Sequence, residues 1–153
     1  MVKLIKAPDS LMNLQGRSVF LAGSIEGSHS INWQDTVSLL LQHVDITLLD
    51  PRRTDWDASW VESISDVNFK HQTEWELAAM ELADFMLLNF VAGSNSAISL
   101  LELGLQAHSG KVIIVCPPDY WKKGNVDMVA SRYNLPVFVD IQAGVAWLKH
   151  KLG

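Results

Sequence analysis

Residues Asp84 to Gly104, with the sequence DFMLLNF-VAGSNS-AISLLELG, contain the pattern from which the fold is predicted. Its first part is an almost continuous apolar run with the length of a buried strand. The middle part, residues 91–96, is small and polar and is typical of a loop. The last part, residues 97–104, is expected to form an apolar helix that carries one carboxylate, Glu102.

Glu102 is the residue that this pattern leaves to be explained. On a helix of ~3.6 residues per turn, Ile98 and Leu105 share its face. The other positions around the helix hold the leucines Leu100, Leu101 and Leu103. The helix is therefore expected to be interior, where a charge is costly unless something uses it. Two structural alternatives stay open: a capping box of Ser99 with Glu102, or a carboxylate partly exposed at a helix end.

Size and composition favour one compact domain over residues 1–153. Hydrophobic residues make up 48% of the chain and charged residues 19%, as in ordinary α/β proteins. The formal net charge of −5 argues against non-specific binding to nucleic acid or to an anionic membrane. No apolar run reaches the ~20 residues of a membrane-spanning helix. We therefore expect neither nucleic acid nor a membrane as a partner.

The start of the chain and its cysteine bear on location. Lys3, Lys6 and Asp9 interrupt the first residues, so they do not resemble a signal peptide. The one cysteine, Cys116, lies in an apolar run, which excludes a disulfide framework and fits a reducing compartment. A buried small hydrophobe is favoured over a nucleophile at this position. The expected location is cytoplasmic.

Apolar segments of strand length alternate along the chain with segments of helical period. Five core strands are expected at residues 18–22, 44–50, 85–90, 111–116 and 137–140, and the entry arm has room for a short edge strand at 2–6. Helices are expected at residues 30–43, 68–83, 97–104 and 141–151, with a short one ending near 134. Residues 51–67 form a long connection that contains two tryptophans.

This alternation predicts an α/β fold with a doubly wound five-stranded parallel sheet, a flavodoxin-like or Rossmann-like three-layer sandwich. Ligands of such folds bind beyond the carboxyl ends of the strands, at the topological switch point. The expected site is therefore built from residues 23–28, 51–60, 91–96 and the segment after 117. The sequence Gly23-Ser-Ile-Glu-Gly27 is no dinucleotide fingerprint, because G-x-G-x-x-G is absent, but its backbone N–H groups could contact a polar ligand.

A second inward-facing acid is expected on the helix at 68–83. Glu74 and Glu81 are seven residues apart and share one face, whereas Glu76 points roughly 160° away from them. The alternative is a surface glutamate on a slightly rotated helix. Two inward acids that flank one crevice suit glycosyl chemistry: one attacks the anomeric carbon and the other moves a proton, with the carboxyls ~5 Å apart in retaining enzymes.

Five motifs together resemble a known family. They are FLAGSI (20–25), DPRR (50–53), Q-x-x-W-E-L (72–77), AD (83–84) and SLLELG (99–104). In this order and spacing they are similar to the nucleoside 2-deoxyribosyltransferase superfamily, in its shorter branch with W-E-L and L-E-L-G motifs, over about residues 18–135. The resemblance implies a retaining, ping-pong exchange of nucleobases on 2-deoxyribose, a reaction of nucleotide metabolism and of purine and pyrimidine salvage. It implies that Glu102 is the nucleophile and that Glu76 handles protonation of the base.

The resemblance also implies further site residues. Ser96 falls where members carry a polar group that contacts the sugar hydroxyls or a 5′-phosphate. Transferases of free nucleosides often have aspartate there and hydrolases of monophosphates often have serine, so the substrate stays open. Members borrow residues from a neighbouring subunit through the loop after the fourth strand, which here contains Asn125 and Met128. A homo-oligomer, a dimer or larger, is therefore implied.

The remaining candidates would contact the nucleoside and its base. Gly23 to Ile25 could give close backbone contact, Arg52 or Arg53 could orient a polar group, and one of Trp33, Trp56, Trp60 and Trp75 could stack on the base, although a core role is favoured for any one tryptophan. The full set of substrate-binding candidates is Gly23, Ser24, Ile25, Trp33, Arg52, Gln72, Trp75, Gly93, Ser96, Ser99, Asn125 and Met128. The histidines are scattered without metal-ligand spacing, so neither a metal nor a cofactor is expected.

Three functional hypotheses follow. The preferred one is transfer of deoxyribose between nucleobases. The second is an N-glycoside hydrolase of nucleosides or nucleoside 5′-monophosphates. The third is a nucleotide-binding module without chemistry. Base preference, tolerance of ribose and subunit number stay open.

Overall fold

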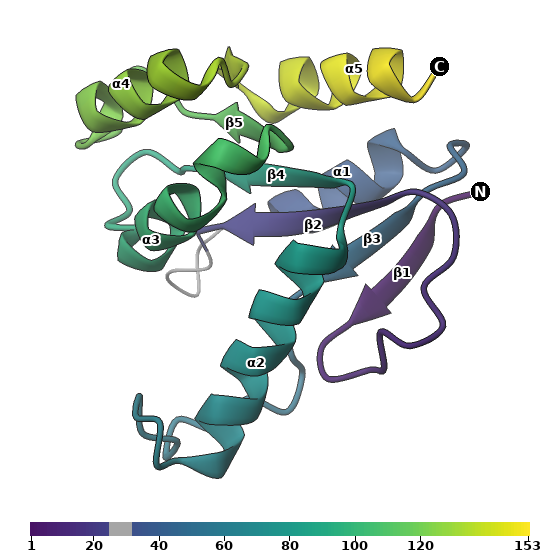
Figure 1. The fold of residues 1–153 in the computed structure, drawn as a ribbon, viewed down its shortest axis with the longest axis vertical. Helices are drawn as coiled ribbons and strands as arrows, with labels where there is room; N and C mark the ends of the chain where they lie inside the picture. The colour runs from purple at the N-terminus through teal and green to yellow at the C-terminus, as the bar shows by residue number, and fades with distance from the viewer. Residues whose placement is uncertain (25–31) are drawn as a thin grey trace.

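The structure, a computed structural model, describes residues 1–24 and 32–153 (Figure 1). Its strands are β1 (Lys3–Lys6), β2 (Ser18–Gly23), β3 (Thr47–Asp50), β4 (Phe85–Asn89), β5 (Val112–Val115) and β6 (Val137–Phe138). They form one six-stranded sheet in the order β1-β3-β2-β4-β5-β6, and all neighbouring pairs are parallel. Five of these strands are the predicted ones, in the flavodoxin-like order. The sixth is the edge strand β1, which pairs with β3.

Helices cover both faces of this sheet. They are α1 (Trp33–Leu40), α2 (Val67–Leu82), α3 (Ala97–Gln106), α4 (Lys123–Tyr133) and α5 (Ile141–Leu152), with a short 3₁₀ turn at Ala107–Ser109. Side chains of α2, α3 and α4 pack on one face of the sheet, and those of α1 and α5 pack on the other. The result is the three-layer α/β sandwich that the sequence predicts, and none of the helices that the structure describes is long and apolar enough to cross a membrane.

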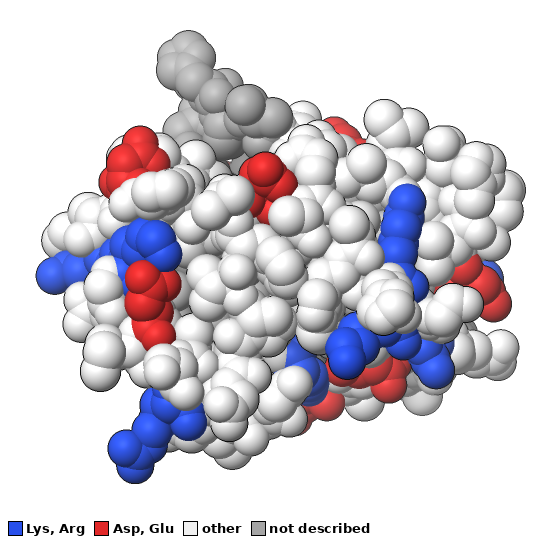
Figure 2. All heavy atoms as spheres, turned by 90° about the horizontal axis from the view of Figure 1, so that it is seen from above, with Lys and Arg blue, Asp and Glu red and all other residues white. Residues whose placement is uncertain are grey.

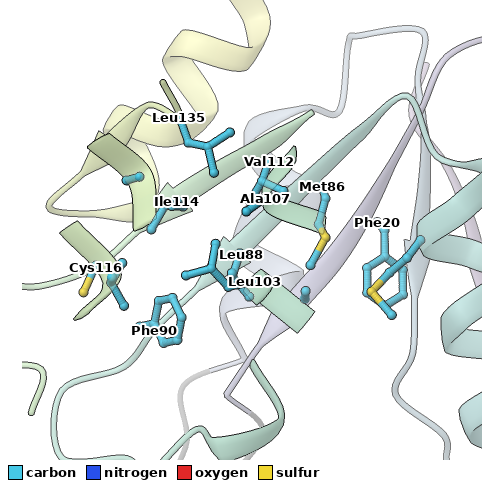
Figure 3. Close-up of a cluster of buried hydrophobic side chains, with 14 of the residues drawn as sticks. Phe20, Met86, Leu88, Phe90, Leu103, Ala107, Val112, Ile114, Cys116 and Leu135 are labelled. Carbon is cyan, nitrogen blue, oxygen red and sulfur yellow. The ribbon is translucent and has the colours of Figure 1, made fainter. Parts of the chain in front are cut away.

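Strand β4 shows how the sequence divides between the two layers. Met86 and Leu88 point into the cluster under α2, α3 and α4, and Leu87 lies in the cluster under α1 and α5. This alternation follows from the two-residue period of a strand, and an apolar run is stable here because both faces are covered. Figure 3 shows the first cluster, in which Phe90, Leu103 and Ile114 surround Leu88.

Two expectations about the elements need correction. The second strand begins at Thr47 instead of residue 44, because Val44 N–H donates to the Leu41 carbonyl in a turn that joins α1 to β3. The helix at 97–106 is only half interior. Leu103 is buried, but Ile98, Leu101 and Leu105 are 63%, 59% and 45% exposed, because only one side of α3 packs on the sheet.

The switch point lies between β2 and β4, which are neighbours although their chain connections leave in opposite directions. Gly23 ends β2 with a φ of +146°, and a Cβ built there would lie 2.3 Å from the Asn89 carbonyl oxygen. Only glycine fits this contact without moving β4. The amide of Ser24 donates to the same carbonyl at 3.1 Å, so the ends of the two strands are held together.

We predict that Gly23→Ala lowers the free energy of unfolding by about 1–3 kcal/mol, because the new methyl group clashes with backbone. Gly104→Ala is the control, since it lies on α3 and a Cβ there meets nothing within 4 Å. That variant should be neutral or more stable by up to about 1 kcal/mol. Urea unfolding of both proteins measures the difference. Equal stability of Gly23→Ala and wild type would contradict the close approach.

Candidate active site

Helix α3 begins directly after the loop that follows β4. Its N-cap is Ser96, which has left-handed backbone angles (φ 55°, ψ 41°) and whose carbonyl accepts from Leu100 N–H. Ser99 and Glu102 therefore lie inside the helix and do not form a capping box at its start. Both side chains are buried, at 3% and 8% exposure, and they are three residues apart on the side that faces the protein.

Glu102 is a buried acid without a hydrogen-bond donor in the part of the chain that the structure describes. Burial, and then the charge of Glu76, raises the pKa of Glu102 from 4.5 to about 8. The Glu102 carboxyl is therefore largely protonated at neutral pH. A buried ionisable group that nothing nearby neutralises is typical of a functional site.

Glu76 lies on α2 and is half-buried. Burial raises its pKa, and a hydrogen bond from the Gln72 amide (Nε2 to Oε1, 3.1 Å) counteracts that effect. Its charge is the second cause of the shift at Glu102, so the two carboxyls are close enough to repel one another. Glu74 and Glu81, in contrast, are exposed, and Glu74 pairs with Lys70 at 3.5 Å. This is the orientation of α2 that the spacing of its acids predicts.

Three serine hydroxyls meet at the ends of β2 and β4. Ser94 Oγ lies 2.9 Å from Ser24 Oγ and 2.7 Å from Ser96 Oγ, and the hydroxyls of Ser24 and Ser96 are also in contact. Ser94 also donates to the Val91 carbonyl at 2.6 Å. Ser24 and Ser96 are among the residues predicted from the sequence, whereas Ser94, which lies in the same polar loop as Ser96, is not. Its contact with Ser24 joins residues 70 positions apart, so no local sequence pattern predicts it.

The two arginines after β3 have different partners. Arg52 binds Asp50 through Nε (3.1 Å) and Nη2 (2.7 Å), and its Nη2 also contacts Asp35 at 2.9 Å. Asp50 is fully buried, so Arg52 neutralises a core carboxylate. Arg53 instead reaches the helix that carries Glu76: its Nη1 donates to Gln72 Oε1 at 3.5 Å. Of the two arginines, Arg53 thus contacts the residue that binds Glu76, whereas Arg52 pairs with Asp50 and Asp35.

The tryptophan candidates have structural contacts. Trp33 is 5% exposed, and its indole N–H donates to the Ser24 carbonyl at 3.0 Å, so it supports the end of β2 from inside the core. The indole N–H of Trp75 donates to the Asp9 carbonyl at 2.8 Å, which ties α2 to the N-terminal arm. Trp56 and Trp60 pack against each other in the connection after β3, with ring centroids 4.8 Å apart.

The remaining candidates lie around the same end of the sheet or on α4. Gly93 is exposed in the loop after β4 and has a φ of +78°. Asn125 and Met128 are both exposed on α4 and face away from the core of their own chain. The loop before α4 is anchored on the Asn95 carbonyl, which accepts from Tyr120 Oη at 2.8 Å and from Trp121 Nε1 at 3.1 Å. Ile25 lies outside the described residues.

Other features of the described residues do not add to this site. A cavity of about 740 Å³ lies between the N-terminal arm and α2, where Leu11, Trp75 and Leu82 line it, and neither glutamate of the pair contributes to it. No group of three His, Cys, Asp or Glu side chains that could hold a metal occurs within 1–24 and 32–153. On the face shown in Figure 2, basic and acidic side chains are interspersed.

The protein is thus a doubly wound α/β protein in which a buried carboxyl, Glu102, interacts with a half-buried one, Glu76. The family model described as "nucleoside 2-deoxyribosyltransferase like" matches residues 16–120, which is more than half of the chain. The chain therefore belongs to this family. No curated protein matches it.

We predict that Glu102→Gln stabilises the protein more as the pH rises. A carboxyl with a pKa raised in the folded state favours folding below its unfolded value of 4.5, and this advantage is lost as the pH rises to about 8. The gain in unfolding free energy of Glu102→Gln over wild type should thus grow across this window, by up to about 5 kcal/mol, and then level off. Urea unfolding between pH 5 and 9 measures it.

The matched control is Glu74→Gln, which changes an exposed acid of α2. Its difference from wild type should stay nearly constant over the same pH range. A constant difference for Glu102→Gln as well would show that Glu102 is not held in a site that disfavours its charge.

Proposed function

We propose that the protein transfers 2-deoxyribose between nucleobases by double displacement, with Glu102 as the nucleophile and Glu76 as the acid and base. The observation that carries the proposal is Glu102 itself, a carboxyl that is only 8% exposed, has no donor among the described residues and interacts with a second acid. Membership of the nucleoside 2-deoxyribosyltransferase-like family supports the substrate class. The free-energy cost of burying two interacting carboxyls is explained if both acids act on the substrate.

The reaction balances with the one proton that the pair holds. In the first half, a carboxylate oxygen of Glu102 bonds to C1′ while the bond from C1′ to the base nitrogen breaks, and Glu76 delivers the proton to the departing base. In the second half, Glu76 removes a proton from the incoming base, which attacks C1′ and releases Glu102. Two adjacent carboxyls resist joint ionisation, so the pair holds one proton. That proton lies on Glu102 in the free protein and passes to Glu76 as the nucleoside binds, which leaves Glu102 as the attacking carboxylate and Glu76 as the acid.

The serine cluster of Ser24, Ser94 and Ser96 supports a neutral sugar as ligand. Hydroxyls both donate and accept hydrogen bonds, as sugar hydroxyls do, and they carry no charge to balance a phosphate. Both arginines of the neighbouring segment have carboxylate partners: Arg52 binds Asp50 and Asp35, and Arg53 binds Asp55. We therefore favour a free nucleoside over a 5′-monophosphate.

The test incubates the protein with a 2′-deoxynucleoside and a different free base. We expect a new nucleoside, detected by chromatography and mass spectrometry, and an adduct of deoxyribose on the peptide that contains Glu102 when no acceptor is present. Free 2-deoxyribose without exchange would indicate a hydrolase instead, and binding without turnover would indicate a module that only binds. Repeating the assay with the 5′-monophosphate tests the preference for a neutral substrate.

We predict that Glu102→Ala abolishes exchange, with a fall of at least about 10³-fold, because it removes the carboxylate that forms the covalent intermediate. Its circular dichroism spectrum should match that of wild type. Glu74→Ala, on the exposed side of α2, is the control and should keep its rate. Exchange at the normal rate by Glu102→Ala would overturn the assignment of the nucleophile.

We also infer that the active form is a homo-oligomer. Ile98, Leu101 and Leu105 follow helical spacing and expose an apolar stripe on the helix that carries Glu102. Asn125 and Met128 are exposed on α4, which covers the same face of the sheet as α3, so they are available to a neighbouring copy. Burial of the stripe against a second copy would remove its apolar surface from water.

We predict that Leu101→Lys weakens this association and lowers exchange activity with it, because a charge would enter an apolar contact. Light scattering after size-exclusion chromatography measures the mass. Leu39→Lys is the control, because Leu39 is similarly exposed (64%) but lies on α1, on the other side of the sheet. A wild-type protein that is monomeric and fully active at assay concentration would refute the inference.

A further inference from the structure

Gln72 is a buried amide, 5% exposed, and both hydrogens of its Nε2 and one lone pair of its Oε1 are used in hydrogen bonds. Its Nε2 donates to the Pro51 carbonyl at 2.8 Å and to Glu76 Oε1 at 3.1 Å. Its Oε1 accepts from Arg53 Nη1 at 3.5 Å. Because Nε2 has two hydrogens and each has an acceptor, the amide cannot flip without losing both bonds and placing its oxygen against two acceptors.

The partners that orient Gln72 come from the connection after β3. Arg53 uses Nε and Nη2 for Asp55, at 2.9 and 2.8 Å, and its guanidinium lies 5.0 Å from the centroid of the Trp60 ring. These contacts fix the plane of the guanidinium and leave Nη1 for Gln72. The Gln72 amide thus lies between the positively charged guanidinium of Arg53 and the carboxyl of Glu76. The groups that face Glu76 among the described residues are Glu102 from α3 and, through Gln72, Arg53 with its partner Asp55.

We propose that Gln72 is a positioning residue for the acid–base group: held by Arg53 and the Pro51 carbonyl, its amide aims the Glu76 carboxyl and stabilises its ionised form. The proposal concerns the reaction proposed above and rests on it for its kinetic part. In this proposal Gln72 acts on Glu76 and does not bind the substrate itself. An amide donor favours the carboxylate over the acid, so without Gln72 the proton would bind Glu76 more tightly and leave it later. Glu102, which has no such donor among the described residues, then holds the proton of the pair until it passes to Glu76.

The experiment titrates Glu76 directly and needs no substrate. Protein labelled with ¹³C at the glutamate carboxyls is prepared in a Glu102→Gln background, which removes the coupled titration. The Glu76 resonance is assigned by its loss in Glu76→Gln. Replacing Gln72 by Met keeps the volume and removes the donor, so the midpoint should rise by about one pH unit. Arg53→Met removes the donor to Gln72 Oε1 but keeps the hydrogen bond from Gln72 to the Pro51 carbonyl. The midpoint of Glu76 should therefore rise in this variant too, but by less than in Gln72→Met.

Gln142→Met, an exposed position on α5, is the matched control and should leave the midpoint unchanged. If Gln72 only joins α2 to the end of β3, Gln72→Met will lower thermal stability without moving the midpoint, and the proposal fails. If that variant does not fold, Arg53→Met decides, and an unchanged midpoint there overturns the proposal. With Glu102 intact, Gln72→Met should lower kcat about tenfold with KM within about twofold. A shifted midpoint without any exchange activity would leave the positioning role standing and refute the proposed function alone.

Discussion

The contact between Gly23 and the Asn89 carbonyl is the constraint on which the site depends. It brings the ends of β2 and β4 together at the point where the chain turns to opposite faces of the sheet. Ser24 follows directly on one strand, and the loop with Ser94 and Ser96 follows on the other, so their hydroxyls meet. The same loop starts α3, and the start of α3 determines that Glu102 lies on its buried side. A change of one backbone contact would therefore alter the hydroxyl cluster and the direction of Glu102 together.

The acid pair opposes stability, and the fold holds it in spite of that. Burial disfavours ionisation of both carboxyls, and the charge of Glu76 further disfavours ionisation of Glu102, as the raised pKa values of the two groups express. A protein selected for stability alone would place leucine or glutamine at Glu102, where the rest of the helix is apolar. The surrounding layers compensate through Phe90, Leu103 and the other side chains of the cluster in Figure 3, which pack around strands buried on both faces.

Much of this arrangement could be predicted from the sequence, because local patterns determine it. The alternation of apolar strands with helices gave the sheet, and the spacing of Glu74, Glu76 and Glu81 separated the inner acid from the exposed ones. The partners of Arg52 and Arg53 could not be predicted, since adjacent residues after a strand point in different directions and a hydrogen bond to Gln72 crosses 19 residues. The exposure of one side of α3 could not be predicted either. An apolar helix face indicates a packing surface, but it does not show whether the same chain or another copy packs on it.

The long connection after β3 matters because its contacts help to fix the orientation of α2. Glu102 is attached to the core strand β4 through a short loop, whereas Glu76 stands on a helix that enters after sixteen irregular residues, 51–66. A helix reached through so long a segment needs other contacts to fix its rotation, and a rotation by one residue would turn Glu76 away from Glu102. Asp66 caps its first turn by accepting from Asn68 and Phe69 N–H. Gln72 then joins the helix to Pro51 at the end of β3, and the pairing of Arg53 with Asp55 beside Trp60 gives that segment a defined shape. The orientation of Glu76 is thus fixed by these contacts, although Glu76 is reached by a far less regular route than Glu102.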